Sequence, residues 1–267
     1  MRVLITNDDG INAPGIRALA RAVHSAGHDV TVAAPRAEAS GMSAALTAVT
    51  ERGELMLEPC DFDGVAAVAV AASPGYIAVL AGLGAFGQRP DVVLSGINRG
   101  ANAGHAILHS GTVGAALTAA NEGMSALAVS LDVLTAVDAS AASGGAAIEA
   151  LNTADDEARH WDTAAGIAVR LLPWLAEAPP ATVLNLNVPD LVADELRGVC
   201  RATLAPFGQV QMAIAEKGGS FLRTAVEQHD REQVPGSDVS LLAEGYATVT
   251  AVCPPAQCPD VQPPTDR

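Results

Sequence analysis

The chain opens with a short apolar run that ends in two adjacent acids and a glycine, reading VLITNDDG over residues 3–10. A run of this kind predicts a buried strand with Asp8 and Asp9 at its carboxyl end. Pro14 and Gly27 bracket a helical apolar pattern, since proline favours the first helical turn and glycine follows the last. A second apolar strand over residues 29–34 completes a strand–helix–strand unit, which implies parallel pairing.

The alternation of strands and helices continues beyond this unit. Apolar runs predict further strands over residues 65–71, 91–95, 126–130 and 182–186. Helical spacing predicts helices over residues 74–83, 112–121 and 161–175, and a glycine- and asparagine-rich loop is expected over residues 96–111. This order predicts an α/β fold with a doubly wound, mostly parallel sheet, whose ligand crevice lies at the carboxyl ends of the strands.

Composition divides the chain into three parts. We expect residues 1–189 to form the α/β catalytic core, with a mobile excursion rich in Ala, Ser, Gly and Asp over residues 135–156. Short extended segments over residues 190–252 predict a β-rich extension, of the kind that often serves as an oligomerisation arm. The proline-rich tail over residues 253–267 is expected to be disordered.

Net charge and cysteine usage limit the partners. The formal net charge of −15 makes binding to a nucleic acid polymer a poor hypothesis, because the surface would repel a phosphodiester backbone. A small phosphorylated substrate remains compatible with it, since a cation and a few backbone N–H groups can create a local field. The four cysteines match no zinc or redox spacing. We expect free thiols in a cytoplasmic protein with no signal peptide and no membrane span.

Asp8 and Asp9 are the first candidates for chemistry. Two carboxylates at the tip of a buried strand stand where open α/β sheets bind ligands, and hard oxygen ligands suit Mg²⁺ or Mn²⁺. The alternative is that residues 7–10 form only a polar turn that caps the next helix.

Two later loops offer further oxygen donors. Ser40, Gly41 and Ser43 follow the second strand, where glycine permits close backbone approach and the hydroxyls can bind an ion or a phosphate. Asn98 and Asn102 lie in the long polar loop after the strand at residues 91–95, and such a loop usually has a function.

Ser110, Gly111 and Thr112 begin a predicted helix whose first N–H groups lack partners within the helix, which makes an anion site. Simple capping of that helix by Ser110 or Thr112 is the alternative. Other common sites are absent from the sequence: there is no G-x-G-x-x-G after the first strand, no Walker A loop, no G-x-S-x-G elbow and no H-E-x-x-H.

Taken together, these segments make the sequence resemble the SurE family, the survival-protein-E nucleotidases. The resemblance lies in residues 3–15, 34–47, 90–104 and 110–116, and more weakly in residues 185–189 and 245–250. It implies a Rossmann-like core and a C-terminal extension exchanged between subunits of a homodimer or homotetramer.

The resemblance also implies a site and an activity. One divalent ion per subunit, Mg²⁺ or Mn²⁺, would be held by the residues Asp8, Asp9, Ser40 and Asn98. The substrate phosphate would lie near Asn102, Ser110, Gly111 and Thr112, and we add Asn7, Gly41 and Ser43 as neighbouring contacts. The activity implied is hydrolysis of 5′- and 3′-nucleoside monophosphates by metal-activated water, with Asp8 or Asp9 orienting or deprotonating that water.

Four places depart from the family pattern, since relatives usually carry other residues around Tyr76, His109 and Thr118 and in residues 250–252. They bear on the identity of the substrate and on the geometry of the oligomer more than on the class of reaction. Two alternatives therefore remain at this point, the same chemistry on a different metabolite phosphate and a non-catalytic ligand-binding module of SurE type.

Overall fold

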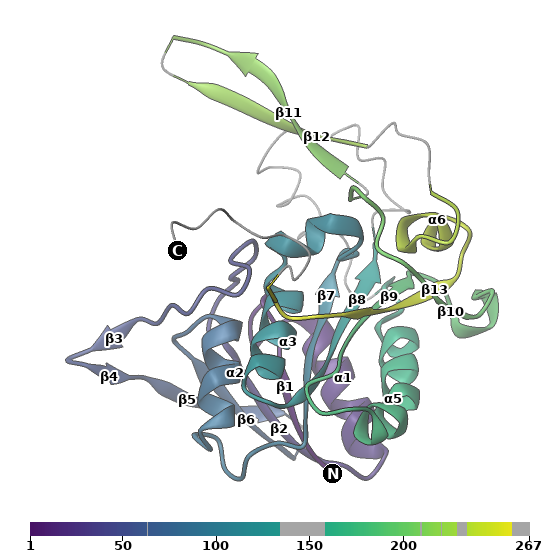
Figure 1. The fold of residues 1–267 in the computed structure, drawn as a ribbon. Coiled ribbons are helices and arrows are strands. Elements are labelled where there is room, and N and C mark those ends of the chain that lie inside the picture. The colour runs from purple at the N-terminus through teal and green to yellow at the C-terminus, as the bar shows by residue number, and fades with distance from the viewer. Residues whose placement is uncertain (63, 134–157, 209, 220, 229–233, 258–267) are drawn as a thin grey trace, which may run out of the picture.

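The computed structural model describes residues 1–62, 64–133, 158–208, 210–219, 221–228 and 234–257. Within them a large mixed sheet carries helices on both faces, which confirms the predicted Rossmann-like α/β class (Figure 1). In spatial order its strands are β10 (Val199–Arg201), β13 (Ala247–Val252), β9 (Val183–Pro189), β8 (Ser125–Asp132), β7 (Val92–Arg99), β1 (Arg2–Thr6), β2 (Asp29–Pro35), β6 (Val65–Val70) and β5 (Leu57–Phe62).

Strand β1 lies at the point where the strand order reverses. It pairs in parallel with β2 on one side and with β7 on the other. The chain runs from β1 to β2 and then to the edge strand β5, which leads into β6 beside β2, before it returns to β7 on the opposite side of β1. In open α/β sheets ligands bind at the carboxyl ends of strands at such a switch point, so Asp8 and Asp9 follow the strand best placed to carry a site.

Two pairs of helices cover the two faces of the sheet (Figure 1). Helices α1 (Pro14–Ser25) and α5 (Trp161–Glu177) pack on one face, and α2 (Pro74–Gly82) and α3 (Gly111–Asn121) on the other. Successive side chains of β1 point to opposite faces of the sheet. Val3 and Ile5 join the core under α1 and α5, while Leu4 joins the core under α2 and α3.

The predicted loop over residues 96–111 is wrong in its first part. Strand β7 continues to Arg99, since Asn98 and Arg99 pair with Ser130 and Leu131 of β8 after a shift in register. The glycine that suggested a loop has a packing reason instead: a Cβ on Gly96 would lie 2.3 Å from the Val129 carbonyl oxygen. A 3₁₀ helix, η1 (Gly104–His109), then leads into α3.

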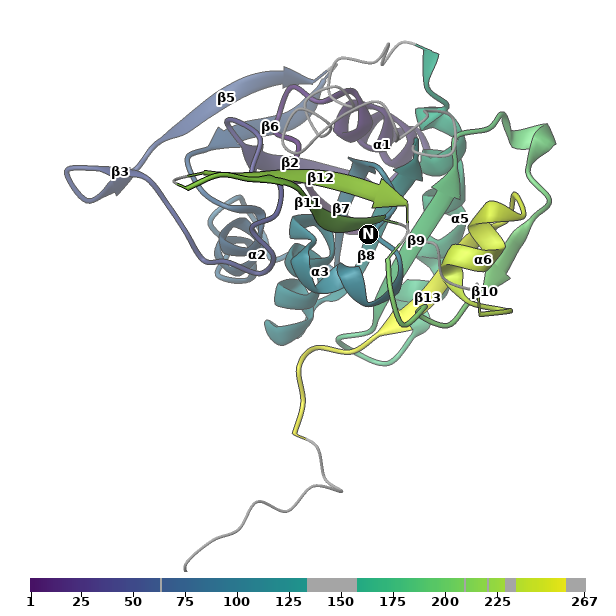
Figure 2. The same ribbon diagram turned by 90° about the horizontal axis from the view of Figure 1, so that it is seen from above.

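The segment after residue 189 is partly built into the main sheet. β13 pairs with β9 and β10 pairs with β13, while η5 (Ala193–Glu195) and α6 (Asp238–Ala243) connect them. The antiparallel hairpin β11 (Val210–Lys217) and β12 (Leu222–Gln228) projects away from the sheet (Figure 1). In the view from above, this hairpin is drawn across the core (Figure 2). A smaller hairpin joins β3 (Thr50–Glu51) to β4 (Glu54–Leu55).

Two expectations concern residues that are not described. The excursion expected over residues 135–156 and the last ten residues of the tail, 258–267, lie outside the described ranges. Across the part of the chain that the structure does describe, no helix combines the length and the apolar character needed to cross a membrane.

Asp190 joins the end of β9 to the start of α5. Arg159 Nη1 donates to Asp190 Oδ2 at 2.8 Å, and the His160 backbone N–H donates to Oδ1 at 2.9 Å. Burial alone would raise the pKa of Asp190, but the donors from His160 and Arg159 outweigh it and hold that pKa below its usual range. The ionised carboxylate therefore stabilises this junction.

We predict that Asp190→Asn lowers the free energy of unfolding by about 2 kcal/mol near neutral pH, because a buried acceptor loses its charge-assisted bonds. Since the folded pKa is depressed, the stabilisation is present above the ordinary carboxyl pKa of 3.8 and is lost as pH falls through the lower folded value. Urea unfolding of both proteins between pH 3 and pH 7 measures this.

The matched control is Asp162→Asn, which removes an ion pair to Arg21 whose two side chains are largely exposed. Exposed pairs contribute little, so this variant should unfold close to the parent. Equal losses of stability in the two variants would contradict the role given to Asp190.

Candidate metal and phosphate site

Asp8 is buried at the tip of β1 and bonded to two other elements. Its side chain is 3 % exposed. Thr112 Oγ1, in the first turn of α3, donates to Asp8 Oδ1 at 2.5 Å, and the Thr112 backbone N–H also donates to the carboxylate. On the other side the Ala39 N–H donates to the Asp8 carbonyl oxygen at 2.7 Å. Asp8 thus ties together β1, α3 and the loop after β2.

Asp9 is less well paired than Asp8. The Arg99 backbone N–H donates to the Asp9 carboxylate, but Asp9 Oδ2 is buried and has no hydrogen-bond partner among the described residues. Burial raises the pKa of Asp9 to about 7; the Asp8 carboxylate adds to the rise and Arg99 opposes it. A buried carboxylate oxygen without a donor calls for a cation.

The two acids and Glu38 create a strongly negative region. Burial raises the pKa of Asp8 above its ordinary value, although the hydrogen bonds from Thr112 oppose this rise. The Glu38 carboxylate, in the loop after β2, raises the pKa of both Asp8 and Asp9. Because burial and neighbouring negative charge disfavour the ionised forms of Asp8 and Asp9, a positive ion is the simplest way to keep both carboxylates charged.

The oxygen donors around the acids fit a hard divalent ion. Besides Asp9 Oδ2, the Asn7 Oδ1 atom is buried and unpartnered, while Asn7 Nδ2 donates to the Gly10 carbonyl oxygen at 2.9 Å. Among the described residues no group of three His, Cys, Asp or Glu side chains is arranged to hold a metal. A cation here would need two carboxylates completed by neutral oxygens, which is a donor set suited to Mg²⁺ or Mn²⁺.

Ser40 and Asn98 lie next to residues that are bonded to the acids. Ser40 follows Ala39, but its hydroxyl donates to Glu38 Oε1 at 2.8 Å rather than meeting Asp8. Asn98 precedes Arg99 and donates through Nδ2 to the Gly100 carbonyl oxygen at 2.7 Å, which leaves its amide oxygen available. Glu38, in the loop after β2, and Arg99, at the end of β7, were missed in the sequence because isolated charges carry no recognisable spacing.

The start of α3 combines a capped helix terminus with a contact to Asp8. Ser110 Oγ accepts from the Val113 N–H at 3.1 Å, so it caps the helix. The Thr112 hydroxyl donates its hydrogen bond to Asp8. A Cβ on Gly111 would lie 2.6 Å from Asp8 Oδ2. Glycine is therefore required at residue 111 for Asp8 to approach the helix terminus.

Asn102 is held firmly by residues from two neighbouring strands. Its N–H donates to Asn187 Oδ1 at 2.8 Å, and its Nδ2 donates to Ser130 Oγ at 2.9 Å. Its carbonyl oxygen accepts from Asn185 Nδ2 at 2.7 Å and from Asn187 Nδ2 at 2.9 Å. Alternating asparagines on β9 were the sequence signal for this support, since residues two apart lie on one face of a strand.

The loop of Gly41 and Ser43 reaches α3. Ser43 Oγ donates to the Leu108 carbonyl oxygen at 2.7 Å. A Cβ on Gly114 would lie 2.4 Å from the Ser43 backbone, so this glycine lets the loop pack on the helix. Gly41 is exposed, with φ of +75°. The loop after β2 and the start of α3, two segments predicted to bind phosphate, therefore pack together. The Ser43 hydroxyl itself is bonded to the Leu108 carbonyl oxygen.

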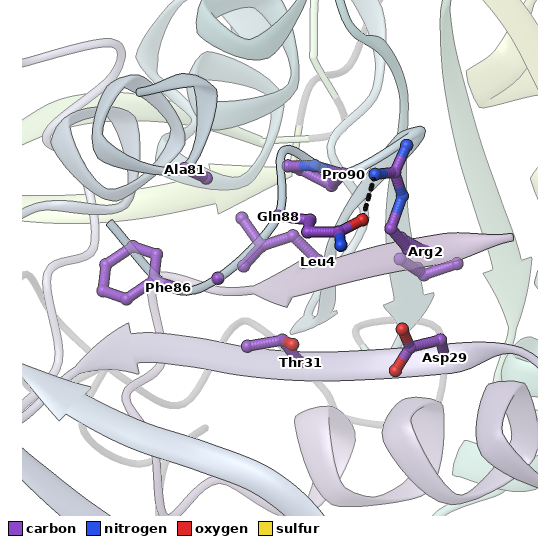
Figure 3. Close-up of a pocket in the computed structure, with 10 residues that line it drawn as sticks. Arg2, Leu4, Asp29, Thr31, Ala81, Phe86, Gln88 and Pro90 are labelled. Carbon is purple, nitrogen blue, oxygen red and sulfur yellow. Dashed lines mark hydrogen bonds between the residues drawn. The ribbon is translucent and has the colours of Figure 1, made fainter. Parts of the chain in front are cut away.

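A separate pocket of about 290 Å³ lies at the opposite end of the sheet (Figure 3). Arg2 and Asp29, the first residues of β1 and β2, line it together with the turn before β7. Arg2 Nη1 donates to Gln88 Oε1 at 2.8 Å there. The length of β1, roughly 16 Å, separates this pocket from the acids, so it is not part of the candidate site.

The family model described as Survival protein SurE matches residues 3–209. The chain belongs to the SurE family. It is 37 % identical over 260 residues to the 5′-nucleotidase SurE of Gloeobacter violaceus, covering 94 % of this chain and 89 % of that one. It is 34 % identical over 257 residues to the 5′/3′-nucleotidase SurE of Escherichia coli O9:H4, with the same coverage of 94 % and 89 %.

A solved structure of a SurE-family member supports the fold. The SurE protein from Aquifex aeolicus aligns with a TM-score of 0.71 and 29 % sequence identity, over 97 % of this chain and 95 % of that one. The family and its fold thus extend across nearly the whole chain, including the segment after residue 189.

We predict that Thr112→Val weakens Mn²⁺ binding about 10- to 100-fold, because Asp8 loses the donor that orients it. Titration calorimetry of the full chain measures this. The control is Thr118→Val in the same helix, whose hydroxyl donates to the Gly114 carbonyl oxygen at 2.7 Å and not to an acid. Equal Mn²⁺ affinities in the two variants would show that Thr112 does not position a metal ligand.

Proposed function

We propose that this chain hydrolyses nucleoside monophosphates to nucleoside and phosphate, as a divalent-metal-dependent phosphomonoesterase. The observation that carries the proposal is the pair Asp8 and Asp9 at the switch point of the sheet, where Asp8 is buried and the buried Oδ2 atom of Asp9 has no donor among the described residues. The names of its SurE-family relatives, 5′-nucleotidase and 5′/3′-nucleotidase, support the same reaction.

One Mg²⁺ or Mn²⁺ per subunit is proposed to be held by Asp8 and Asp9, with Ser40 and Asn98 supplying neutral oxygens. When bound, the ion would stabilise the negative charge on the phosphoryl oxygens as a Lewis acid. For Ser40 this requires its hydroxyl to turn from Glu38, to which it donates in the structure. The amide oxygen of Asn98 needs no such change, because Gly100 engages only its nitrogen.

The remaining polar residues are proposed to hold and orient the substrate phosphate. Asn102 is fixed by Ser130, Asn185 and Asn187, so it would offer a polar group that costs little to order. The start of α3 favours an anion by its orientation, with Ser110, Gly111 and Thr112 around it. Asn7, Gly41 and Ser43 complete the set, and one acid of the pair is proposed to orient the attacking water.

We further propose that the cytoplasmic protein assembles as a homodimer or homotetramer through the hairpin β11–β12. The hairpin projects from the sheet (Figure 1). It carries Ile214, Phe221 and Leu222 at its surface, which are 65 %, 51 % and 60 % exposed. Large apolar side chains exposed together commonly mark a protein interface.

Asp8→Asn and Asp9→Asn are each expected to lower Mn²⁺-dependent phosphate release from AMP by at least about 100-fold, since each removes a charge needed to bind the ion. Phosphate release with and without chelator is the measurement. Asp29→Asn is the control, because Asp29 is an exposed acid at the amino end of β2. Full metal-dependent turnover by Asp8→Asn would contradict the proposed metal-dependent hydrolase site.

A panel of phosphate esters tests the substrate class. We expect the four common nucleoside monophosphates to give a higher kcat/KM than sugar phosphates and other metabolite phosphates under the same Mn²⁺ concentration. A higher kcat/KM for a metabolite phosphate would show that the preferred substrate is another phosphate ester. Absence of chelator-sensitive turnover on every ester, including an aryl phosphate, would favour a binding module.

A further inference from the structure

An apolar groove of about 490 Å³ opens beside the loop that follows β2. Its floor includes Pro35 at the end of β2 and Val70 at the end of β6, which are both buried. Met42 and Val49 lie along its sides and are 36 % and 72 % exposed. A volume of this size falls within the range of small-molecule pockets, roughly 300–1,000 Å³.

The groove adjoins the loop after β2, which also carries residues of the proposed metal and phosphate site. Ala39, one of its lining residues, donates its backbone N–H to the Asp8 carbonyl oxygen at 2.7 Å. Met42, another, stands between Gly41 and Ser43 in the proposed phosphate loop. The groove therefore lies on the side of Asp8 that contacts the loop after β2.

The chemistry of the lining suits an apolar group. No carboxylate or carboxamide side chain lines the groove among the described residues. Backbone groups at its edge are already paired, since the Val49 N–H donates to the Ala71 carbonyl oxygen at 2.8 Å. What the groove offers is mainly apolar contact area.

Arg36 adds one polar group to this lining. Its Nη2 pairs with Glu58 Oε1 at 2.8 Å, but its Nε is buried and has no hydrogen-bond partner. A buried guanidinium donor without an acceptor is costly, so a ligand that supplies an acceptor here would be favoured.

We propose that this groove binds the nucleoside part of the substrate, with the base against Met42 and Val49 and an acceptor of the base or ribose facing Arg36. This assignment rests on the proposed function and makes residues 36–49 the segment that distinguishes a nucleotide from a simple phosphate ester. Bases combine an apolar face with acceptor atoms, and the groove provides a complement to both.

The test compares AMP with ribose 5-phosphate, which carries the same phosphate and sugar without the base. Phosphate release is measured with the full chain and Mn²⁺ for the parent, the double variant Met42→Ser with Val49→Ser, and the control Leu83→Ser. Leu83 is 76 % exposed at the end of α2 remote from Ser73 and the groove. In the double variant, the ratio of kcat/KM for AMP to that for ribose 5-phosphate should fall about tenfold.

The outcomes separate the two proposals. A fall in this ratio for the double variant but not for Leu83→Ser supports the groove. An unchanged ratio with normal AMP turnover overturns the groove and leaves the hydrolase intact. An unchanged ratio with a smaller oligomer in sedimentation velocity also overturns it, since the groove would then be a contact between copies of the chain.

Complete absence of turnover in the parent would overturn the proposal that the chain is a hydrolase. Adenosine binding would then test whether the groove binds a nucleoside. We expect adenosine, which has no phosphate, to shift the backbone amide NMR signals of Val49 and Ala72 in the full chain. The double variant should lose these shifts. Unperturbed signals in the parent at saturating adenosine would overturn the proposal independently of any catalysis.

Discussion

The hydrogen bond between Thr112 and Asp8 is the interaction on which the site depends. It joins the first strand to a helix 104 residues later in the chain. Without the Thr112 donors a carboxylate at this depth would face the full cost of desolvation, which is what raises its pKa. The absence of a side chain at Gly111 permits this contact, because any Cβ there would collide with Asp8.

The sheet determines which loops can meet these acids. Because β1 pairs with β2 and with β7, the segments leaving all three strands emerge side by side at one edge. The loop after β2 reaches Asp8 through Ala39, and the end of β7 reaches Asp9 through Arg99. Residues far apart in the sequence thus surround one point through backbone contacts.

The fold class and the main site segments could be predicted from the sequence because they depend on local signals. Apolar runs with turn residues located β1 and β2, and proline and glycine marked the ends of α1. The continuation of β7 could not be foreseen, because Gly96 is required by a contact with Val129 that depends on tertiary packing. Glu38 and Arg99 escaped notice for the same reason: only the folded chain brings them to the acids.

The two ends of the main sheet have a consequence for how the molecule avoids uncontrolled association. An outermost strand offers unpaired backbone groups that can template growth of a sheet from one molecule to the next. At one border β10 is only three residues long, and at the other β5 contains Pro59, which has no N–H to offer. Both borders are therefore poor templates for fibril-like stacking, which leaves self-recognition to surfaces outside the sheet.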